Sequence, residues 1–343
     1  MTPTARFSLR DRLTGVPALK GLAAEVEAGV PVIEAEIARN VTFADDVADA
    51  TGRYLLDAGG KRMRPTLAII TAQLGDGLTD DVTLAAAAIE LTHLASLYHD
   101  DVMDEAPLRR GVPSAHIVWG NSVAILTGDL LFSRASTMMS RLGERAMALQ
   151  AETFERLCIG QMHETVGPQP GEDPVAHYLR VLSDKTGSLI SAAARAGVRY
   201  ANGPTEYEAP LVNFGEKIGV AFQLADDVID LAPAADATGK KAGTDLRAGV
   251  PTLPTLLLAQ AAQTDPHARE LQQRIRDAAS SDGTDEQLES VTAELFAHPV
   301  TQATRDEARR WAAEAMDGLE ALPSGPVRTA LNLFAEHVVA RTD

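Results

Sequence analysis

Helical periodicity extends over nearly all of this 343-residue chain. Alanine and leucine are abundant, and alternating runs of β-branched residues are scarce. Apolar residues recur three and four positions apart, which is typical of helices with one buried face. The pattern predicts long helices over 80–104, 121–141, 143–166 and 205–231, and shorter ones over 43–57, 65–74, 174–200 (broken near 183–185), 251–263, 284–296 and 303–320. We therefore expect an all-α fold.

The ends of these segments carry ordinary helix signals. Thr79 or Asp80 suits the N-cap of the first long helix, and Pro65 and Pro251 suit first turns. None of the breaks between helices resembles an interdomain linker. We expect one domain over 1–343, with 1–29 as a candidate N-terminal extension.

The composition excludes several classes of protein. Lys and Arg number 31 against 48 Asp and Glu, and the net charge of −17 argues against a non-specific nucleic-acid surface. The single cysteine, Cys158, excludes an intramolecular disulfide and fits a reducing cytoplasm. The N-terminal residues MTPTARFSLRDRL lack the apolar run of a signal peptide, and no stretch is apolar for long enough to predict a membrane span.

Two aspartate triplets of identical spacing lie inside predicted helices. The first consists of Asp100, Asp101 and Asp104, and the second of Asp226, Asp227 and Asp230. On a helix, residues i, i+1 and i+4 lie at about 0°, 100° and 40° around the axis, so the carboxylates of each triplet share a face. Hard oxygen ligands suit Mg²⁺, which bridges carboxylates to phosphates. One triplet alone is equally explained by a solvated face, but two on separate apolar helices favour metal sites that hold one diphosphate.

Basic residues occur at several separate positions along the chain. GlyGlyLysArgMetArgPro (59–65) stands at a loop-to-helix junction, where glycines allow close approach and the helix N-terminus attracts anions. Arg109 and Arg110 follow the first triplet, and Lys185 and Thr186 lie at a helix break. These groups would offset the acidity of the chain locally, and they suit two phosphorylated substrates better than one.

Two further features lie beside the triplets. His93 and Ser96 continue the polar stripe of the first triplet along its helix; a lone histidine there is otherwise a satisfied core residue. Lys240 lies in the polar, glycine-rich segment 237–249, which follows the second triplet. We expect that segment to be a mobile flap over a charged ligand, with an ordinary solvated loop as the alternative.

Together these motifs resemble the trans-type isoprenyl diphosphate synthases of the polyprenyl synthetase family. The resemblance runs from about residue 30 to the C-terminal helices. The matching motifs, in the family's order, are 59–65, Glu-Leu-Thr-His at 90–93, the first Asp-Asp-x-x-Asp, Arg-Arg-Gly at 109–111, Lys-Thr at 185–186, the second Asp-Asp-x-x-Asp preceded by Phe222 and Gln223, and Gly-Lys-Lys-Ala-Gly-Thr-Asp at 239–245. Each motif is weak alone, and the set is specific.

The resemblance implies a helical bundle around a deep central cavity, usually in a homodimer, and an Mg²⁺-dependent head-to-tail condensation of an allylic diphosphate with isopentenyl diphosphate. It assigns Mg²⁺ on the allylic diphosphate to both triplets, with Asp227 and Asp230 less firmly placed than Asp226. Contacts to the allylic diphosphate are implied for Arg109, Lys185 and Lys240, and contacts to isopentenyl diphosphate for Lys61, Arg64, His93 and Arg110. Thr186 and Gln223 would lie beside the allylic cation.

The chain departs from the family at Val250, where members often have Lys. One basic contact is therefore missing, or is supplied by Lys241 or Arg247.

Small side chains near the first triplet bear on product length. Ala95 and Ser96, about one turn before Asp100, would form the floor of the cavity, and neither is bulky enough to stop elongation early. Only two residues separate Asp101 from Asp104, whereas many short-chain members have an insertion there. Both features favour a long product such as a quinone side-chain precursor. A floor set lower, by Phe132, Met138 or Met139, is the alternative, and it would suit a farnesyl or geranylgeranyl diphosphate synthase.

Three other classes explain the sequence less well. A terpene cyclase has no need of a second diphosphate site. A His-Asp phosphohydrolase built on His99 and Asp100 would need more histidines at helical spacing than His93 and His116. A non-catalytic subunit would have lost the aspartates. The reaction of a synthase has a hydrophobic product, for which we expect transient membrane contact.

Overall fold

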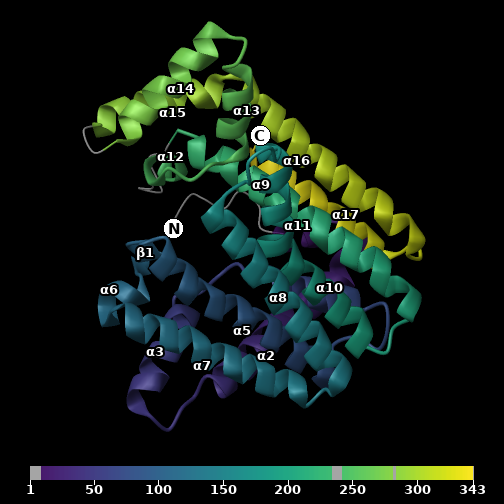
Figure 1. Cartoon of the computed structure of the whole chain (residues 1–343). Helices are drawn as coiled ribbons and strands as arrows, with labels where there is room; N and C mark the ends of the chain where they lie inside the picture. The colour runs from purple at the N-terminus through teal and green to yellow at the C-terminus, as the bar shows by residue number, and fades with distance from the viewer. Residues whose placement is uncertain (1–8, 234–241, 281–282, 343) are drawn as a thin grey trace.

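The computed structural model describes residues 9–233, 242–280 and 283–342. Within these ranges the chain is almost entirely helical (Figure 1). The long elements are α2 (Lys20–Asn40), α5 (Asp80–Met103), α7 (Asn121–Ser140), α8 (Glu144–Val166), α11 (Glu208–Leu231) and α16 (Pro299–Asp317). The shorter ones are α1 (Leu9–Gly15), α3 (Asp46–Asp57), α4 (Met63–Ala72), α6 (Ala115–Trp119), α9 (Pro174–Leu182), α10 (Ser188–Tyr200), α12 (Thr244–Ala248), α13 (Leu253–Ala261), α14 (Pro266–Ala279), α15 (Asp285–Ala297) and α17 (Pro326–Val339). The expected all-α fold is confirmed.

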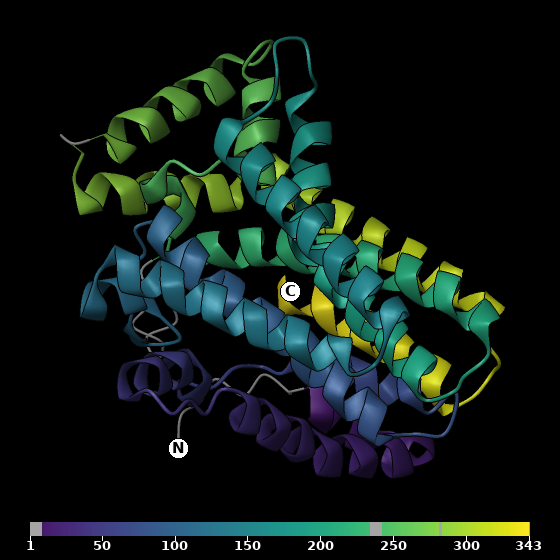
Figure 2. The ribbon, with the colours of Figure 1, turned by 60° about the horizontal axis from the view of Figure 1, so that its bottom comes forward.

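The main bundle is organised around α5, α10 and α11. α5 packs chiefly against α7, α10 packs against α4 and α11, and α16 and α17 lie along α11 (Figures 1 and 2). Their facing sides bury one large apolar cluster, in which Tyr98 and Phe214 are the largest fully buried side chains. At neighbouring α14 and α15 a second, smaller apolar cluster forms, which includes Leu258, Leu271 and Leu295. The two triplet-bearing helices therefore belong to the rigid main bundle.

The structure follows most of the predicted helices and corrects several details. Thr79, not Asp80, caps α5, because its side chain accepts a hydrogen bond from the Val82 amide at 3.1 Å. Pro251 precedes α13 instead of lying in its first turn, and Pro254 occupies that turn. The helices α1, α2, α6, α12, α14 and α17 were not predicted, nor were the two-residue strands β1 (Leu108–Arg109) and β2 (Val112–Pro113).

The N-terminal helices pack directly on the bundle. Leu13, Leu19 and Val26, all within the candidate N-terminal extension 1–29, are buried in the main apolar cluster. None of the helices in the described part of the chain is both long and apolar enough to cross a membrane.

Candidate active site

The first triplet stands where α5 ends. Asp104 is the C-cap residue and is exposed, whereas the Asp101 side chain is fully buried. Arg109 donates from Nε to Asp101 Oδ1 at 2.6 Å, and Asp101 Oδ2 is buried with no hydrogen-bond partner. Burial, opposed by Lys185, raises the pKa of Asp100 to about 6. The three carboxylates therefore meet different environments, although they are within one turn.

A tight hairpin presents Arg109 and Arg110. Its two turn residues, Arg110 and Gly111, have φ of 54° and 82°, as a type I′ turn requires. A left-handed conformation is sparsely populated for arginine and is found preferentially at functional sites. Nη1 of Arg110 donates to the Leu55 carbonyl at 2.6 Å. The turn thus directs Arg109 toward the first triplet and Arg110 toward α3.

Lys185 is placed by a π-helical turn, η2 (Ser183–Gly187), between α9 and α10. A Cβ on Gly160 of α8 would lie 2.8 Å from the Lys185 backbone nitrogen, so only glycine allows α8 this close. Arg156 of α8 donates to Asp184 at 3.0 Å and fixes the same turn. Lys185 pairs with Glu164 of α8, and although burial opposes its charge, Asp100 and Glu164 outweigh that effect and raise its pKa.

The second triplet occupies the C-terminal part of α11, and its members also differ. Asp227 is only 2% exposed, and its Oδ2 accepts hydrogen bonds from the Tyr178 hydroxyl at 2.8 Å and the Leu253 amide at 3.3 Å. Burial, despite these donors, raises its pKa to about 7. Asp226 Oδ1 accepts a hydrogen bond from Arg341 at 2.6 Å. Asp230 Oδ2 accepts one from the Asp245 amide at 3.0 Å.

A chain of contacts links the two triplets. Lys185 lies between Asp100 and Glu164, and Glu164 lies within electrostatic reach of Tyr178, whose hydroxyl binds Asp227. The turn that holds Lys185 packs on both α8 and α11. Thr186 belongs to this turn, and Gln223 lies one helical turn before Asp227 on α11. Both residues are therefore close to the elements that join the triplets.

Four basic groups predicted to bind isopentenyl diphosphate come from α4, α5 and the loops beside them. Burial lowers the pKa of His93 well below its usual value, and Arg64, Arg110 and Arg109 lower it further. Gly60 has a φ of 154°, and a Cβ at this position would lie 2.9 Å from Arg62 Nη1 and 3.1 Å from Arg110 Nη2. A glycine here therefore allows the loop before α4 to lie close to both arginine side chains. The structure thus gathers Arg64, His93 and Arg110, while Lys61 lies 5.5 Å from the centre of the Phe222 ring.

Sequence reasoning missed a buried acid under this group. The Glu90 side chain is 4% exposed and accepts a hydrogen bond from Arg62 Nη1 at 3.4 Å. Its negative charge partly offsets the lowering by burial of the pKa of Arg64 and Arg110. Glu90 lies one turn before His93 on the same polar stripe, so its position in the sequence could have indicated a role in the site. Glu164, Tyr178 and Arg341 were missed as well. They lie outside every motif, so the sequence does not indicate that they belong to the site.

The segment after the second triplet is described only in part. Lys240 and Lys241 lie outside the described residues. Arg247 pairs with Asp285 of α15 at 2.7 Å, and Val250 is exposed. Of the segment expected to form a flap, residues 244–248 form the short helix α12.

The donors suit Mg²⁺ that is shared with phosphate. In the described ranges, no three acidic, histidine or cysteine side chains lie close enough to hold a metal ion unaided. Mg²⁺, however, commonly takes one or two carboxylates and completes its shell with water and substrate phosphates. The partnerless Oδ2 of Asp101 and the exposed Asp104 carboxylate provide such oxygens.

The two predicted floor residues face different helices. Ser96 lies between Asp100, which faces Lys185, and Thr92, whose hydroxyl accepts a hydrogen bond from Gln150 of α8 at 2.7 Å. Ala95 lies one turn before His99, whose ring contacts the Ile125 carbonyl of α7 at 3.1 Å. Phe132 of α7 stacks on Phe154 of α8 with ring centres 3.7 Å apart. Met138 and Met139 are fully buried.

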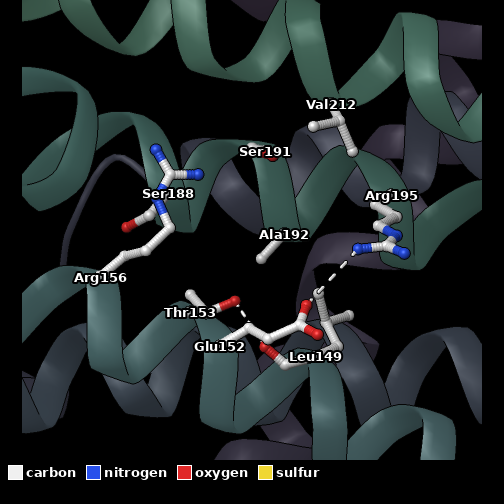
Figure 3. A pocket seen from close by; sticks show the side chains of 9 residues that line it. All are labelled: Leu149, Glu152, Thr153, Arg156, Ser188, Ser191, Ala192, Arg195 and Val212. Carbon is white, nitrogen blue, oxygen red and sulfur yellow. Dashed lines mark hydrogen bonds and ion pairs between the residues drawn. The ribbon is translucent and has the colours of Figure 1, made fainter.

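A separate cavity of about 80 Å³ lies among α8, α10 and α11 (Figure 3). Its two arginines already have acidic partners: Arg156 binds Asp184 and Glu216, and Arg195 binds Glu208. None of the predicted site residues lines it. We therefore place the candidate site at the triplets.

The all-α fold agrees with what known relatives show, namely that the chain is a prenyltransferase of the isoprenyl diphosphate synthase class. The polyprenyl synthetase family model matches residues 45–294, and the chain belongs to that family. It is 42% identical over 322 residues to nonaprenyl diphosphate synthase from Mycobacterium tuberculosis. The matched region covers 93% of this chain and 94% of that relative.

Solved structures agree with this membership. A polyprenyl synthase from Caulobacter crescentus complexed with calcium and isoprenyl diphosphate has a TM-score of 0.84 at 32% identity, over 97% of this chain and 98% of that one. A geranylgeranyl pyrophosphate synthase from Corynebacterium glutamicum, complexed with the same ligands, has a TM-score of 0.80 at 38% identity, over 96% and 98%.

Proposed function

We propose that this protein condenses isopentenyl diphosphate head-to-tail with an allylic diphosphate and releases a long trans-polyprenyl diphosphate. The observation that carries the proposal is that the basic residues near the first triplet act on two different sets of partners. Arg109 and Lys185 interact with the triplet carboxylates, whereas Arg64 and Arg110 act on His93. Two diphosphates would need two such sets of donors.

Each group of side chains has a distinct task in this reaction. Lys185 and Arg109 stabilise the charge that develops on the leaving diphosphate as its C–O bond breaks. Arg64, His93 and Arg110 orient isopentenyl diphosphate so that its double bond meets the allylic carbon. Bound Mg²⁺ would add Lewis-acid stabilisation of the leaving group, with Asp100, Asp101, Asp104 and Asp226 as the residues that hold it. The departing diphosphate is the expected proton acceptor, because no strong base stands among these residues.

A direct test follows the incorporation of labelled isopentenyl diphosphate into farnesyl diphosphate with Mg²⁺, and sizes the dephosphorylated products by chromatography. We expect a ladder that ends beyond geranylgeraniol. Asp100→Asn should lower kcat by about 10³-fold because it weakens the hold on the Mg²⁺ that would stabilise the leaving group. Asp81→Asn, at the exposed N-terminal end of the same helix, is the matched control and should keep full activity. A folded, metal-loaded protein that incorporates no isopentenyl diphosphate would refute the proposal.

Product length is the part with a competing candidate. The 42% identical nonaprenyl synthase supports a long product, and the 38% identical geranylgeranyl synthase supports a short one. Ser96→Phe places a ring on the side of α5 that carries Asp100, whereas Ala95→Phe places it toward α7. We expect Ser96→Phe to shorten the product by several isoprene units and Ala95→Phe to shorten it less. If the unaltered protein stops at geranylgeraniol, or stops at farnesol when geranyl diphosphate is the primer, the short-chain candidate is right.

We further propose a cytoplasmic homodimer. Four large apolar side chains are exposed on α6 and α7: Ile117, Val118, Ile125 and Leu126, the last of them 66% exposed. A second copy that covers this face would remove them from water. The cytoplasmic location rests on the single half-buried Cys158, and transient membrane contact would follow from the hydrophobic product. Light scattering of the unaltered protein and of Leu126→Glu tests the dimer, which the substitution should weaken.

A further inference from the structure

Arg341 reaches the second triplet from the C-terminal end of the described chain. It belongs to the 3₁₀ turn η5 (Ala340–Thr342), which packs on α11. Its Nη2 donates to Asp226 Oδ1 at 2.6 Å, and its guanidinium lies 4.7 Å from the centre of the Phe222 ring. Nη1 is buried with no hydrogen-bond partner in the described structure. The guanidinium is thus held by one carboxylate and one ring face.

The turn that carries Arg341 is itself anchored from one side. Arg305 of α16 donates from Nε to the Thr342 carbonyl at 3.3 Å, and the Thr342 hydroxyl donates to the Val339 carbonyl at 2.9 Å. Lys61 approaches the opposite part of the site, 5.5 Å from the same Phe222 ring. The backbone of η5 is therefore fixed by contacts that do not involve Asp226, and within the described residues Arg341 is the η5 side chain that hydrogen-bonds to the triplet.

We propose that Arg341 is a displaceable counter-ion of Asp226: it neutralises the carboxylate in the metal-free protein, and a divalent cation takes its place. The inference rests on the proposed function, because it takes Asp226 as a metal ligand. A guanidinium and a divalent cation on the same carboxylate repel each other, so we expect the cation to displace the guanidinium from its 2.6 Å contact.

The contact should therefore compete with the metal. Arg341 and Asp226 are both partly exposed, and pairs of this kind are modest in strength. Without the arginine, an incoming cation no longer competes with a guanidinium for the Asp226 carboxylate. We expect Arg341→Gln to bind Mn²⁺, used as the probe and followed by electron paramagnetic resonance, about fivefold more tightly at one site.

Two controls separate the counter-ion from a general charge effect. Arg328→Gln removes one positive charge from the far end of α17, where Arg328 donates to the Leu322 carbonyl, and it should leave Mn²⁺ affinity unchanged. Addition of Asp226→Asn to Arg341→Gln should abolish the gain. An unchanged or weaker affinity in Arg341→Gln, or an equal gain in Arg328→Gln, would overturn the proposal.

The unaltered protein provides a second measurement that needs no substitution. In ¹⁵N-labelled protein, the side-chain Nε–H resonance of Arg341 should shift when Mg²⁺ is added, because its guanidinium leaves Asp226, and the resonance of Arg328 should not shift. An unchanged Arg341 resonance would contradict the proposal. Prenyl transfer by the same preparation reports separately on the proposed function, so that an active enzyme with an unchanged resonance would leave the function standing and remove only the counter-ion.

Discussion

The two aspartate triplets have the same spacing in sequence and different surroundings in the structure. The first ends α5, so its last member is exposed, and its buried middle member binds Arg109. The second lies inside α11, where Asp227 is buried beneath Tyr178 and Asp226 binds Arg341. Helical spacing decides which face a side chain occupies, but the elements packed against that face decide what the side chain does.

The sharpest contrast is expected in catalysis. Arg109→Gln removes the partner of Asp101 and a charge at the leaving group, so kcat should fall by about 10²-fold. Arg341→Gln removes a partner that is displaced before chemistry, and we expect kcat to change by less than about threefold at saturating Mg²⁺. Steady-state kinetics on both variants measures the difference. Equal losses would erase the distinction between the two arginines.

The middle members of the triplets should differ in stability. Asp227→Ala leaves the Tyr178 hydroxyl and the Leu253 amide buried without a partner, at a cost of about 2–4 kcal/mol in the free energy of unfolding. Asp227→Asn retains an acceptor oxygen and should cost much less. Asp226→Ala, at a partly exposed position, should cost about 1 kcal/mol or less. Urea denaturation without metal compares the three, and an equal loss for both alanine variants would show that burial does not separate the positions.

The sequence was sufficient for the fold, and insufficient for the partners of each predicted site residue. The 3.6-residue pattern predicted α5, α7, α8 and α11 nearly to the residue, because long amphipathic helices are encoded locally. The polar character of His93 beside an aspartate motif was equally visible. The Tyr178–Asp227 and Arg341–Asp226 contacts span 49 and 115 residues, and only tertiary packing creates such pairs. α14 and α17 were missed although each carries a proline in its first turn.

A histidine near each triplet allows the smallest test, through the pH dependence of stability. Burial, reinforced by Arg64, Arg110, Arg109 and Arg62, lowers the pKa of His93 well below its ordinary value. Burial, with Arg12, Arg341 and Lys61, lowers that of His337. A lowered folded-state pKa means that the unfolded chain binds more protons just below pH 6.5, so stability falls as the pH falls through that range.

The two histidines should contribute unequally to this acid sensitivity. One fully linked proton changes the free energy of unfolding by at most about 1.4 kcal/mol per pH unit. His93→Gln should remove more of the slope between pH 6.5 and 5 than His337→Gln, because the pKa of His93 is lowered further. His267→Gln, at an exposed position, is the control for a His-to-Gln substitution elsewhere in the chain. Because Arg341 contributes to the lowered pKa of His337, Arg341→Gln should also reduce the part of the slope that His337→Gln removes. If His337→Gln had the larger effect, the group around Arg64 and Glu90 would be less buried than the structure shows, and the contrast between the two sides of the site would need revision.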